Sequence, residues 1–124
     1  CMMVVLTDAP LDSRNLERLA KRAMLGLSRT GGIASNGSGD YVIAVSTAEA
    51  CRIPYERENP IQNVPTLRNE AMNALFLATI EATEEAILNS LFAGETMIGR
   101  DGHKIEALPK EKVLEMLREA GKID

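Results

Sequence analysis

The chain has 124 residues and a net charge of −4, and 45% of its residues are hydrophobic but only 3% are aromatic. This length favours a single domain, and the composition is that of a globular protein whose core is built from aliphatic side chains. Scattered Lys and Arg on an acidic chain argue against binding to nucleic acid, which needs clustered positive charge. The neighbours Lys21 and Arg22 are accordingly predicted to lie on a solvated helix face.

The first part of the chain predicts a strand, a helix and a second strand. Residues 2–7 are a short, apolar, partly β-branched run typical of a buried strand. Asp12 or Ser13 can cap a helix over residues 14–29, in which apolar residues recur on one face. Residues 41–47 repeat the pattern of a buried strand.

The rest of the chain predicts loops and helices. Residues 48–65 contain three prolines and are predicted to form an irregular loop. Thr66 then caps a long helix over about 67–92, and its apolar residues on more than one side indicate burial on several sides. Residues 94–109 are predicted as a loop with short extended pieces, and residues 110–120 as a last short helix.

This order of elements lacks enough strands for an independent sheet. Two strands do not make a stable sheet in water, and the long helix carries more apolar surface than the chain can cover. We therefore predict an α/β (α+β) fold in which residues 1–124 are part of a larger unit, with the remaining strands supplied by a partner chain.

No apolar run reaches the roughly 20 residues that span a bilayer, and no signal peptide is visible. We expect a cytoplasmic protein with no membrane partner. The periplasm stays open, because a segment upstream of Cys1 is not visible. Two cysteines do not make a disulfide framework. Cys51 is predicted to be a structural thiol, and a Cys1–Cys51 bridge stays open as an alternative.

Cys1 is the first candidate for chemistry. If it begins a mature chain, its α-amine can act near neutral pH as the general base for its own thiol, and a thiol needs less activation than a hydroxyl. Three interpretations stay open: a nucleophile freed by removal of an upstream segment, a fragment boundary, and the lipidated cysteine of a lipoprotein. The apolar run MMVVLT argues against the last, because a lipid anchor needs a polar tether.

The stretch SNGSGDY, residues 35–41, is the second candidate. Its small residues permit a close approach of the backbone to another group. Ser38 and Asp40 are two residues apart, and in an extended segment such side chains point to the same side. We therefore predict that the hydroxyl and the carboxylate converge to hold the amine of Cys1 and relay its proton. A plain turn with a solvated Asp40 remains the alternative.

The stretch GRDGHK, residues 99–104, contains residue types found in catalytic sites, but its pattern is more typical of a turn. His103 has no Cys or Glu partner at ligand spacing, which makes it a poor metal site. The Asp101–Gly102 pair favours a tight turn. We predict a structural turn, possible at a subunit contact, and expect no metal or other cofactor.

Four stretches together resemble the L-aminopeptidase/D-esterase family, which includes the β-peptidyl aminopeptidases. They are MMVVLTDAPL led by Cys1, LERLAKRAMLGLSRTG, NGSGDYVIAVST and EATEEAILNSLFAGETMIGRDGHKIEALP. The resemblance covers nearly the whole chain and is weakest over residues 48–65. It implies an αββα sandwich in which residues 1–124 are the C-terminal β-subunit, one domain shared with a separate α-subunit. It also implies a precursor that cuts itself before Cys1.

The resemblance implies a site and an activity as well. The family's nucleophile is usually Ser and sometimes Thr. It matches Cys1, and the helper hydroxyl and acid match Ser38 and Asp40. The implied enzyme is an aminopeptidase, amidase and esterase that releases N-terminal residues from short substrates through an acyl-enzyme. Its substrate pocket lies largely on the α-subunit, and its αβ units form higher oligomers. Whether Cys1 is natural or an introduced replacement stays open.

Two other functions stay open at the level of sequence. Ornithine acetyltransferases have a related architecture and also cleave themselves, so the chain could transfer an acyl group to an amino acid. The chain could instead be a non-catalytic assembly subunit in which Cys1 is only a cleavage scar.

Overall fold

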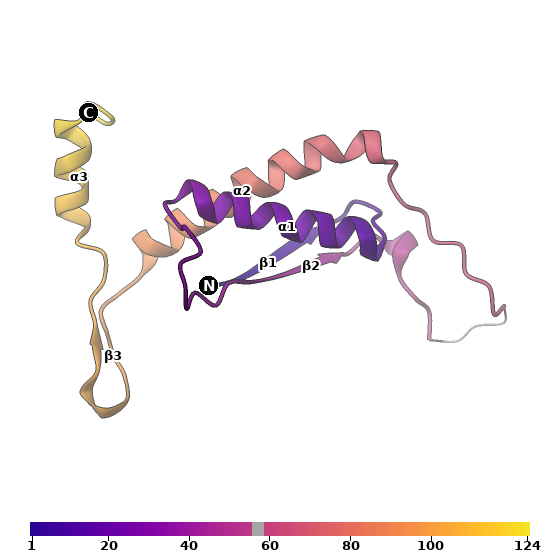
Figure 1. Cartoon of the computed structure of the whole chain (residues 1–124), viewed down its shortest axis with the longest axis horizontal. Helices are drawn as coiled ribbons and strands as arrows, with labels where there is room; N and C mark the ends of the chain where they lie inside the picture. Colours follow the sequence, from indigo (N-terminus) through magenta and orange to yellow (C-terminus); the bar gives the residue numbers. More distant parts are fainter. Residues whose placement is uncertain (56–58) are drawn as a thin grey trace. The chain divides into compact units, whose positions relative to one another are not determined.

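The structure, a computed structural model, describes residues 1–55 and 59–124. It has two compact units, residues 1–85 and 86–124 (Figure 1). The main elements are β1 (Met2–Thr7), α1 (Ser13–Arg29), β2 (Tyr41–Ser46), α2 (Met72–Ala93), β3 (Met97–Ile98), β4 (Lys104–Ile105) and α3 (Lys110–Glu119). The predicted mixture of helices and strands is confirmed.

The first unit is built on a parallel pair of strands joined by a helix. β1 and β2 pair in a register that runs from Met2 opposite Tyr41 to Thr7 opposite Ser46. α1 connects them and begins where the Asp12 carboxylate accepts the backbone N–H of Asn15 at 2.8 Å. The predicted strands and the first helix are therefore confirmed to within a residue, and Asp12 rather than Ser13 is the cap.

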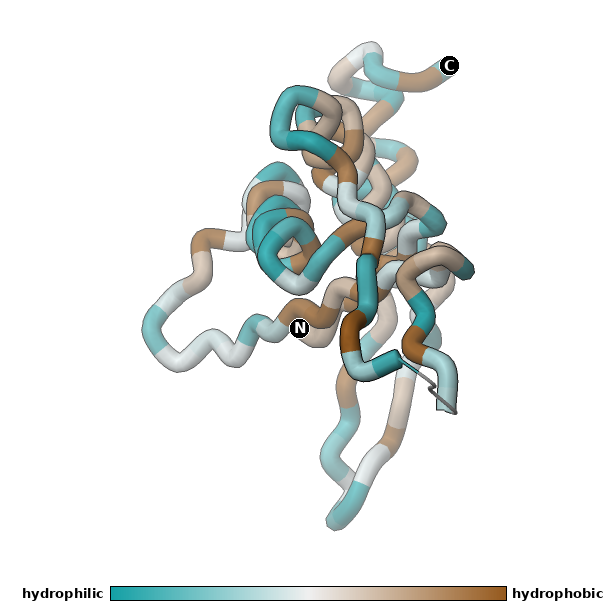
Figure 2. Tube along the Cα trace, turned by 90° about the vertical axis from the view of Figure 1, so that its right-hand side faces the viewer, coloured by the Kyte–Doolittle hydropathy of each residue, from teal (hydrophilic) through white to brown (hydrophobic). Residues whose placement is uncertain are grey.

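The core of the first unit lies on one face of this sheet. α1 and the beginning of α2 cover that face around four buried residues: Leu11, Leu19, Met72 and Phe76. The opposite face is exposed along both strands. The hydrophobic stretch of β1 begins beside the N-terminus (Figure 2). The side chains of the exposed face are Met2, Val4, Leu6, Tyr41, Ile43 and Val45. The strands predicted as buried are thus covered on one side only.

The two helices approach closely at Gly26. A Cβ at this position would lie 2.6 Å from the carbonyl oxygen of Ile80 and 2.7 Å from the Cβ of Thr83. Thr83 is buried in α2, and its hydroxyl donates to the carbonyl of Thr79 at 2.7 Å instead of facing α1 as an unpaired polar group. The close approach therefore depends on a residue without a side chain.

The predicted start of the long helix is wrong. α2 begins at Met72, after a single 3₁₀ turn at Asn69–Ala71. The Thr66 hydroxyl does not cap this helix, because it accepts the backbone N–H of Asp12 at 3.2 Å and the side-chain amide of Asn15 at 3.4 Å. The segment before α2 is therefore tied to the start of α1. One stripe of α2 is buried, whereas Leu77 is 50% exposed.

The prediction that Lys21 and Arg22 lie on a solvated helix face is confirmed for Lys21 and wrong for Arg22. Lys21 is exposed and pairs with Glu17 at 2.6 Å, one helical turn earlier. Arg22 instead lies over the ring of Phe76, with its guanidinium carbon 3.9 Å from the ring centroid. This cation–π contact shields an apolar ring of α2 from water.

The remaining segments follow the predictions. Within the predicted loop 48–65, the described residues contain one 3₁₀ turn, Glu49–Cys51, and Glu56 to Glu58 lie outside the described residues. In the second unit, β3 and β4 form an antiparallel hairpin, and the backbone N–H of Gly99 donates to the carbonyl of His103 at 2.8 Å. The predicted structural turn is confirmed, as is α3 to within a residue.

Among the residues that the structure describes, no helix is both long and apolar enough to cross a membrane. In the same parts of the chain, no group of three or more His, Cys, Asp or Glu side chains is placed to hold a metal ion.

Candidate active site

The parallel register of β1 and β2 creates the candidate site. Met2 pairs with Tyr41, so the residues that precede them, Cys1 and Asp40, lie side by side at the same end of the sheet. The backbone N–H of Tyr41 donates to the carbonyl of Cys1 at 2.9 Å and continues the ladder to this end. Residues 39 positions apart in sequence are therefore brought together by strand pairing.

A turn before β2 places Ser38 next to Asp40. The backbone N–H of Ser38 donates to the carbonyl of Ser35 at 2.8 Å and closes the turn. Gly37 occupies it with φ of 96°, a conformation that side chains disfavour. The chain leaves the turn at Ser38 and enters β2 at Tyr41, so the two intervening positions reach the end of the sheet.

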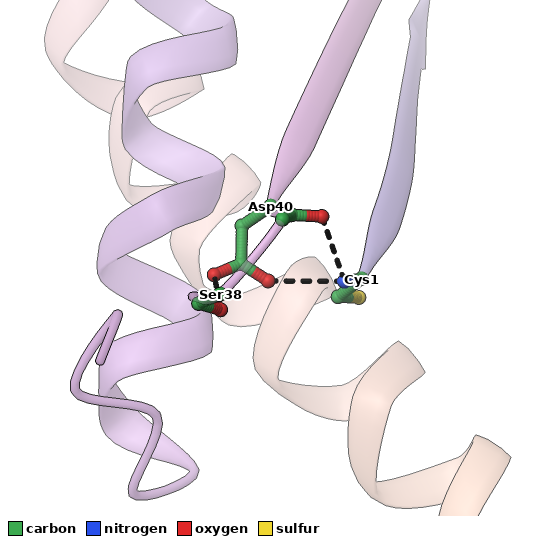
Figure 3. Close-up of polar contacts among 4 residues, drawn as sticks. Cys1, Ser38 and Asp40 are labelled. Atoms are coloured by element: carbon green, nitrogen blue, oxygen red, sulfur yellow. Dashed lines mark hydrogen bonds and ion pairs between the residues drawn. The ribbon is translucent and has the colours of Figure 1, made fainter. Parts of the chain in front are cut away.

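Cys1, Ser38 and Asp40 form one connected cluster (Figure 3). The amino nitrogen of Cys1 lies 3.0 Å from Asp40 Oδ1, as an ion pair and a hydrogen bond. The Ser38 hydroxyl donates to the other oxygen, Asp40 Oδ2. The carbonyl of Gly39 also accepts from the Cys1 nitrogen, at 3.2 Å. The predicted contact of the carboxylate with the amine is present, whereas the Ser38 hydroxyl is linked to the amine only through the Asp40 carboxylate.

The electrostatics of the cluster favour an ionised Asp40. The hydrogen bond from Ser38, and after it the hydrogen bond from the Cys1 amine, hold the pKa of the Asp40 carboxyl below its usual value. Both partners donate to the charged form and therefore stabilise it. The Asp40 side chain is 9% exposed, whereas that of Cys1 is 38% exposed. The carboxylate is thus sheltered while the thiol remains accessible.

This arrangement places a thiol, which can act as a nucleophile, on the same residue as an amine, which can act as a base. The thiol and the amine of Cys1 sit on one residue, and the carboxylate fixes where the amine lies. In its neutral form the amine can take the proton of the thiol, and Asp40 then stabilises the ammonium, which is the form that is ion-paired with it in the structure. Such a cluster is suited to attack on a carbonyl carbon.

Sequence reasoning missed the Gly39 carbonyl and the Tyr41 amide. Both are backbone groups, and a residue-type pattern carries no information about where they point. The available signal was the parallel pairing itself. When residues 2–7 and 41–47 pair in parallel with Met2 opposite Tyr41, the residues before the two strands lie side by side.

The other candidate residues play no part in this cluster. Cys1 and Cys51 are free thiols, so the alternative of a disulfide between them is wrong. The Cys51 thiol is half-buried and lies 3.5 Å from the carbonyl oxygen of Pro65, which agrees with a structural role. His103 belongs to the hairpin of the second unit.

Comparison with known proteins identifies the family. The model of peptidase family S58 matches residues 1–105, which is most of the chain. The chain belongs to peptidase family S58. The resemblance predicted from the sequence is therefore confirmed.

Two curated relatives of this S58 chain are β-peptidyl aminopeptidases. BapA of Sphingosinicella microcystinivorans is 42% identical over 117 residues, and BapA of Sphingosinicella xenopeptidilytica is 37% identical over 117 residues. Each match covers 94% of this chain but only 29% of the relative. The S58 chain thus spans less than a third of the length of these relatives and matches their C-terminal part.

Solved structures extend the likeness to the fold. PH0078 from Pyrococcus horikoshii OT3 is 48% identical with a TM-score of 0.83, over 97% of this chain and 34% of that chain. The L-aminopeptidase D-Ala-esterase/amidase of Ochrobactrum anthropi, described as a variant of the Ntn hydrolase fold, is 33% identical with a TM-score of 0.83, over 98% and 34%. A β-aminopeptidase of Burkholderia sp. is 37% identical with a TM-score of 0.76, over 98% and 35%. The S58 chain has part of this fold.

Proposed function

We propose that the chain is the catalytic β-subunit of an N-terminal-nucleophile aminopeptidase with amidase and esterase activity. A precursor cuts itself before Cys1 and frees the amine. The mature enzyme then releases N-terminal residues from short peptides, amides or esters through an acyl-enzyme on the Cys1 thiol. Cys1, Ser38 and Asp40 carry the reaction, and no cofactor is required.

The proposed reaction begins with the amine of Cys1 accepting the proton of its own thiol. The sulfur attacks the substrate carbonyl, and Asp40 stabilises the ammonium that forms. The ammonium then returns its proton to the leaving amine or alcohol, with Ser38 holding the carboxylate in place. Water hydrolyses the thioester with the same amine as base. A serine aminopeptidase is among the structural relatives, so a thiol here replaces the hydroxyl of that class.

One observation carries this proposal. The Cys1 nitrogen is 3.0 Å from Asp40 Oδ1, and Ser38 holds the other carboxylate oxygen. A residue that served only as a cleavage scar in an assembly subunit would need neither partner. Membership of a peptidase family points to the same chemistry. No observation favours acyl transfer to an amino acid. Addition of ornithine as an acceptor distinguishes that reaction from hydrolysis.

The proposal includes a partner. The chain covers 29% of the curated relatives, and one apolar face of its sheet is exposed. Both support an α-subunit, cut from the same precursor, that lays a second sheet on this face and completes an αββα sandwich as one shared domain. Assembly of the αβ units into a higher oligomer, and the cytoplasmic location, stay predictions.

The full gene provides the test. Its product should separate into two chains by intact mass, the smaller beginning at Cys1, and should release an aminoacyl or β-aminoacyl group from an amide such as a p-nitroanilide. Cys1→Ala should leave the precursor uncut and inactive. Cys51→Ala is the matched control and should be cut and active.

Two results would contradict the proposal. One is a wild-type product that stays uncut yet hydrolyses the substrate, because the free amine would then be unnecessary. The other is a Cys1→Ala protein that keeps its activity. Addition of ornithine as acceptor should leave hydrolysis dominant. Acylated ornithine as the main product would favour acyl transfer instead.

A further inference from the structure

The amine of Cys1 can act as a base, but it can also attack the acyl group that the Cys1 sulfur carries. In the proposed acyl-enzyme, the acyl carbon is bonded to the sulfur of the same residue. If the amine attacks that carbon, the bond from sulfur to the acyl carbon breaks, a bond from nitrogen to the acyl carbon forms, and a proton passes from nitrogen to sulfur. The product is an amide that blocks the base, and the subunit cannot turn over again.

The structure restrains this amine from two sides. Within residues 1–55 and 59–124, it donates to Asp40 Oδ1 at 3.0 Å and to the carbonyl of Gly39 at 3.2 Å. As an ammonium, this group has no lone pair and cannot attack. Once it has lost its third proton, the neutral amine has two N–H bonds for these two acceptors, which leaves its lone pair a single direction. The carbonyl of Cys1 is held as well, by the backbone N–H of Tyr41 at 2.9 Å. Rotation of the amine toward an acyl group on sulfur would break these bonds.

Ser38 holds the restraint itself in place. Its hydroxyl occupies Asp40 Oδ2 and leaves Oδ1 for the amine. The Asp40 side chain is largely sheltered, and its bond to the amine is charge-assisted whenever the amine is protonated. The thiol, by contrast, is accessible. The protection therefore acts on the nitrogen and does not close off the sulfur.

We propose that Asp40 and the Gly39 carbonyl are positioning groups that protect the Cys1 thioester from transfer of its acyl group to the Cys1 amine. The inference rests on the proposed function, because only a cut before Cys1 frees the amine. A cysteine needs this protection more than a serine, because amines attack thioesters more readily than oxygen esters. The groups that orient the base thus also prevent it from becoming the acceptor.

A small acyl thioester tests this inference with a readout other than peptide hydrolysis. The self-cleaved protein from the full gene is incubated with the acetyl thioester of mercaptoethanesulfonate, which exchanges its acyl group onto thiols. Hydroxylamine then removes acetyl groups from sulfur but not from nitrogen. Mass analysis of the peptide that begins at Cys1 measures N-acetylation, and the urea-unfolded subunit gives the rate of unrestrained transfer.

Folded wild-type protein should release mercaptoethanesulfonate in a Cys1-dependent reaction and yet resist N-acetylation. Asp40→Ala should N-acetylate roughly 10- to 100-fold faster, the change expected when one charge-assisted hydrogen bond is lost. Asp8→Ala is the matched control. Asp8 is exposed and has no side-chain hydrogen bond or ion pair in the described parts of the chain, so this variant should behave like wild type.

Circular dichroism and gel filtration establish whether Asp40→Ala folds and assembles. If it does not, Asp40→Asn takes its place, because an amide is a weaker acceptor and should also accelerate N-acetylation.

Three results would overturn the inference. They are fast N-acetylation of folded wild type, full protection in every folded Asp40 variant, and absence of Cys1-dependent thiol release from wild type, since restricted access would then explain the resistance. An uncut precursor would remove the proposed function and this inference together, and intact mass separates that result from the other three.

Discussion

Asp40 divides its two oxygens between different tasks. Oδ1 meets the amine of Cys1, and Oδ2 accepts the hydroxyl of Ser38. The hydroxyl prevents the carboxylate from rotating, so the charge stays where an ammonium would form. Ser and Asp side chains are common in turns. Here the Asp40 carboxylate is paired with an amine because β1 lies beside β2 and places Cys1 next to it.

Asp40→Asn should spare the fold and slow the reaction. The side chains are nearly isosteric, but the amide lacks the negative charge that stabilises the ammonium. We expect kcat to fall by roughly 10- to 100-fold, the effect of weakening a charge-assisted hydrogen bond. Steady-state kinetics on the self-cleaved protein measure this, with circular dichroism as the check on folding. Unchanged kinetics would make the stretch before β2 a plain turn.

Ser38→Ala should raise the pKa of Asp40. The Ser38 hydrogen bond is the first cause of its lowered pKa. In wild type, the stabilisation from ionised Asp40 is present above the pKa of an unfolded aspartate, about 3.9, and is lost as the pH falls through the lower folded value. Without the hydroxyl, the folded pKa lies closer to the unfolded value, so this stabilisation should be smaller and its loss should be complete at a higher pH. A ¹³C NMR titration of the Asp40 carboxyl measures the shift, and identical curves for both proteins would contradict the assigned cause.

At the scale of elements, the packing of α1 on α2 depends on the absence of a side chain. Gly26 lies where a Cβ would overlap the carbonyl oxygen of Ile80 and the Cβ of Thr83. Backbone atoms cannot rotate away as a long side chain would. The helices would have to separate, and the face of the sheet that they cover would pack less closely.

Gly26→Ala should therefore destabilise the protein, although alanine favours helices. We expect a loss of about 1–3 kcal/mol in the free energy of unfolding, as for other overpacked cores. Urea unfolding of the self-cleaved protein measures it. Gly99→Ala is the control, because its Cβ would meet only the carbonyl oxygen of His103 at 3.7 Å. Equal stability of both variants and wild type would contradict this account of the helix contact.

Sequence patterns predicted the elements better than their connections. Short apolar runs located β1 and β2, and apolar residues recurring on one helical face located α1, because these patterns are local. Thr66 was misassigned because a hydroxyl before an apolar run is also the pattern of a cap, and its true partners, Asp12 and Asn15, are more than 50 positions away. For the same reason Ser38 and Asp40 were predictable as a pair, while the Gly39 carbonyl was not.

At the scale of the whole molecule, the main feature is the apolar face of the β1–β2 sheet that no described element of the chain covers. Its six large side chains alternate with those that face α1 and α2, which is the pattern of a strand covered on both sides. Stable sheets generally have more than two strands. Burial of this face against a second sheet would remove it from water, and each large side chain buried contributes about 1.5–3 kcal/mol.

Residues 1–124 expressed alone should therefore not form a stable monomer. We expect low solubility, self-association or a non-cooperative thermal transition, whereas co-expression with the upstream part of the gene should give a soluble αβ unit. Circular dichroism and sedimentation velocity measure both cases. A soluble monomer of residues 1–124 that melts cooperatively would contradict the proposed shared domain.

The central claim is that Cys1 is the nucleophile, and its rate of alkylation tests this most directly. The self-cleaved protein is treated with iodoacetamide, and the labelling of Cys1 and Cys51 is followed by peptide mass analysis alongside residual hydrolysis of an aminoacyl amide. The account predicts that Cys1, which is more exposed, reacts faster than the half-buried Cys51 and that activity falls in proportion to its labelling. Complete labelling of Cys1 with undiminished hydrolysis would contradict it.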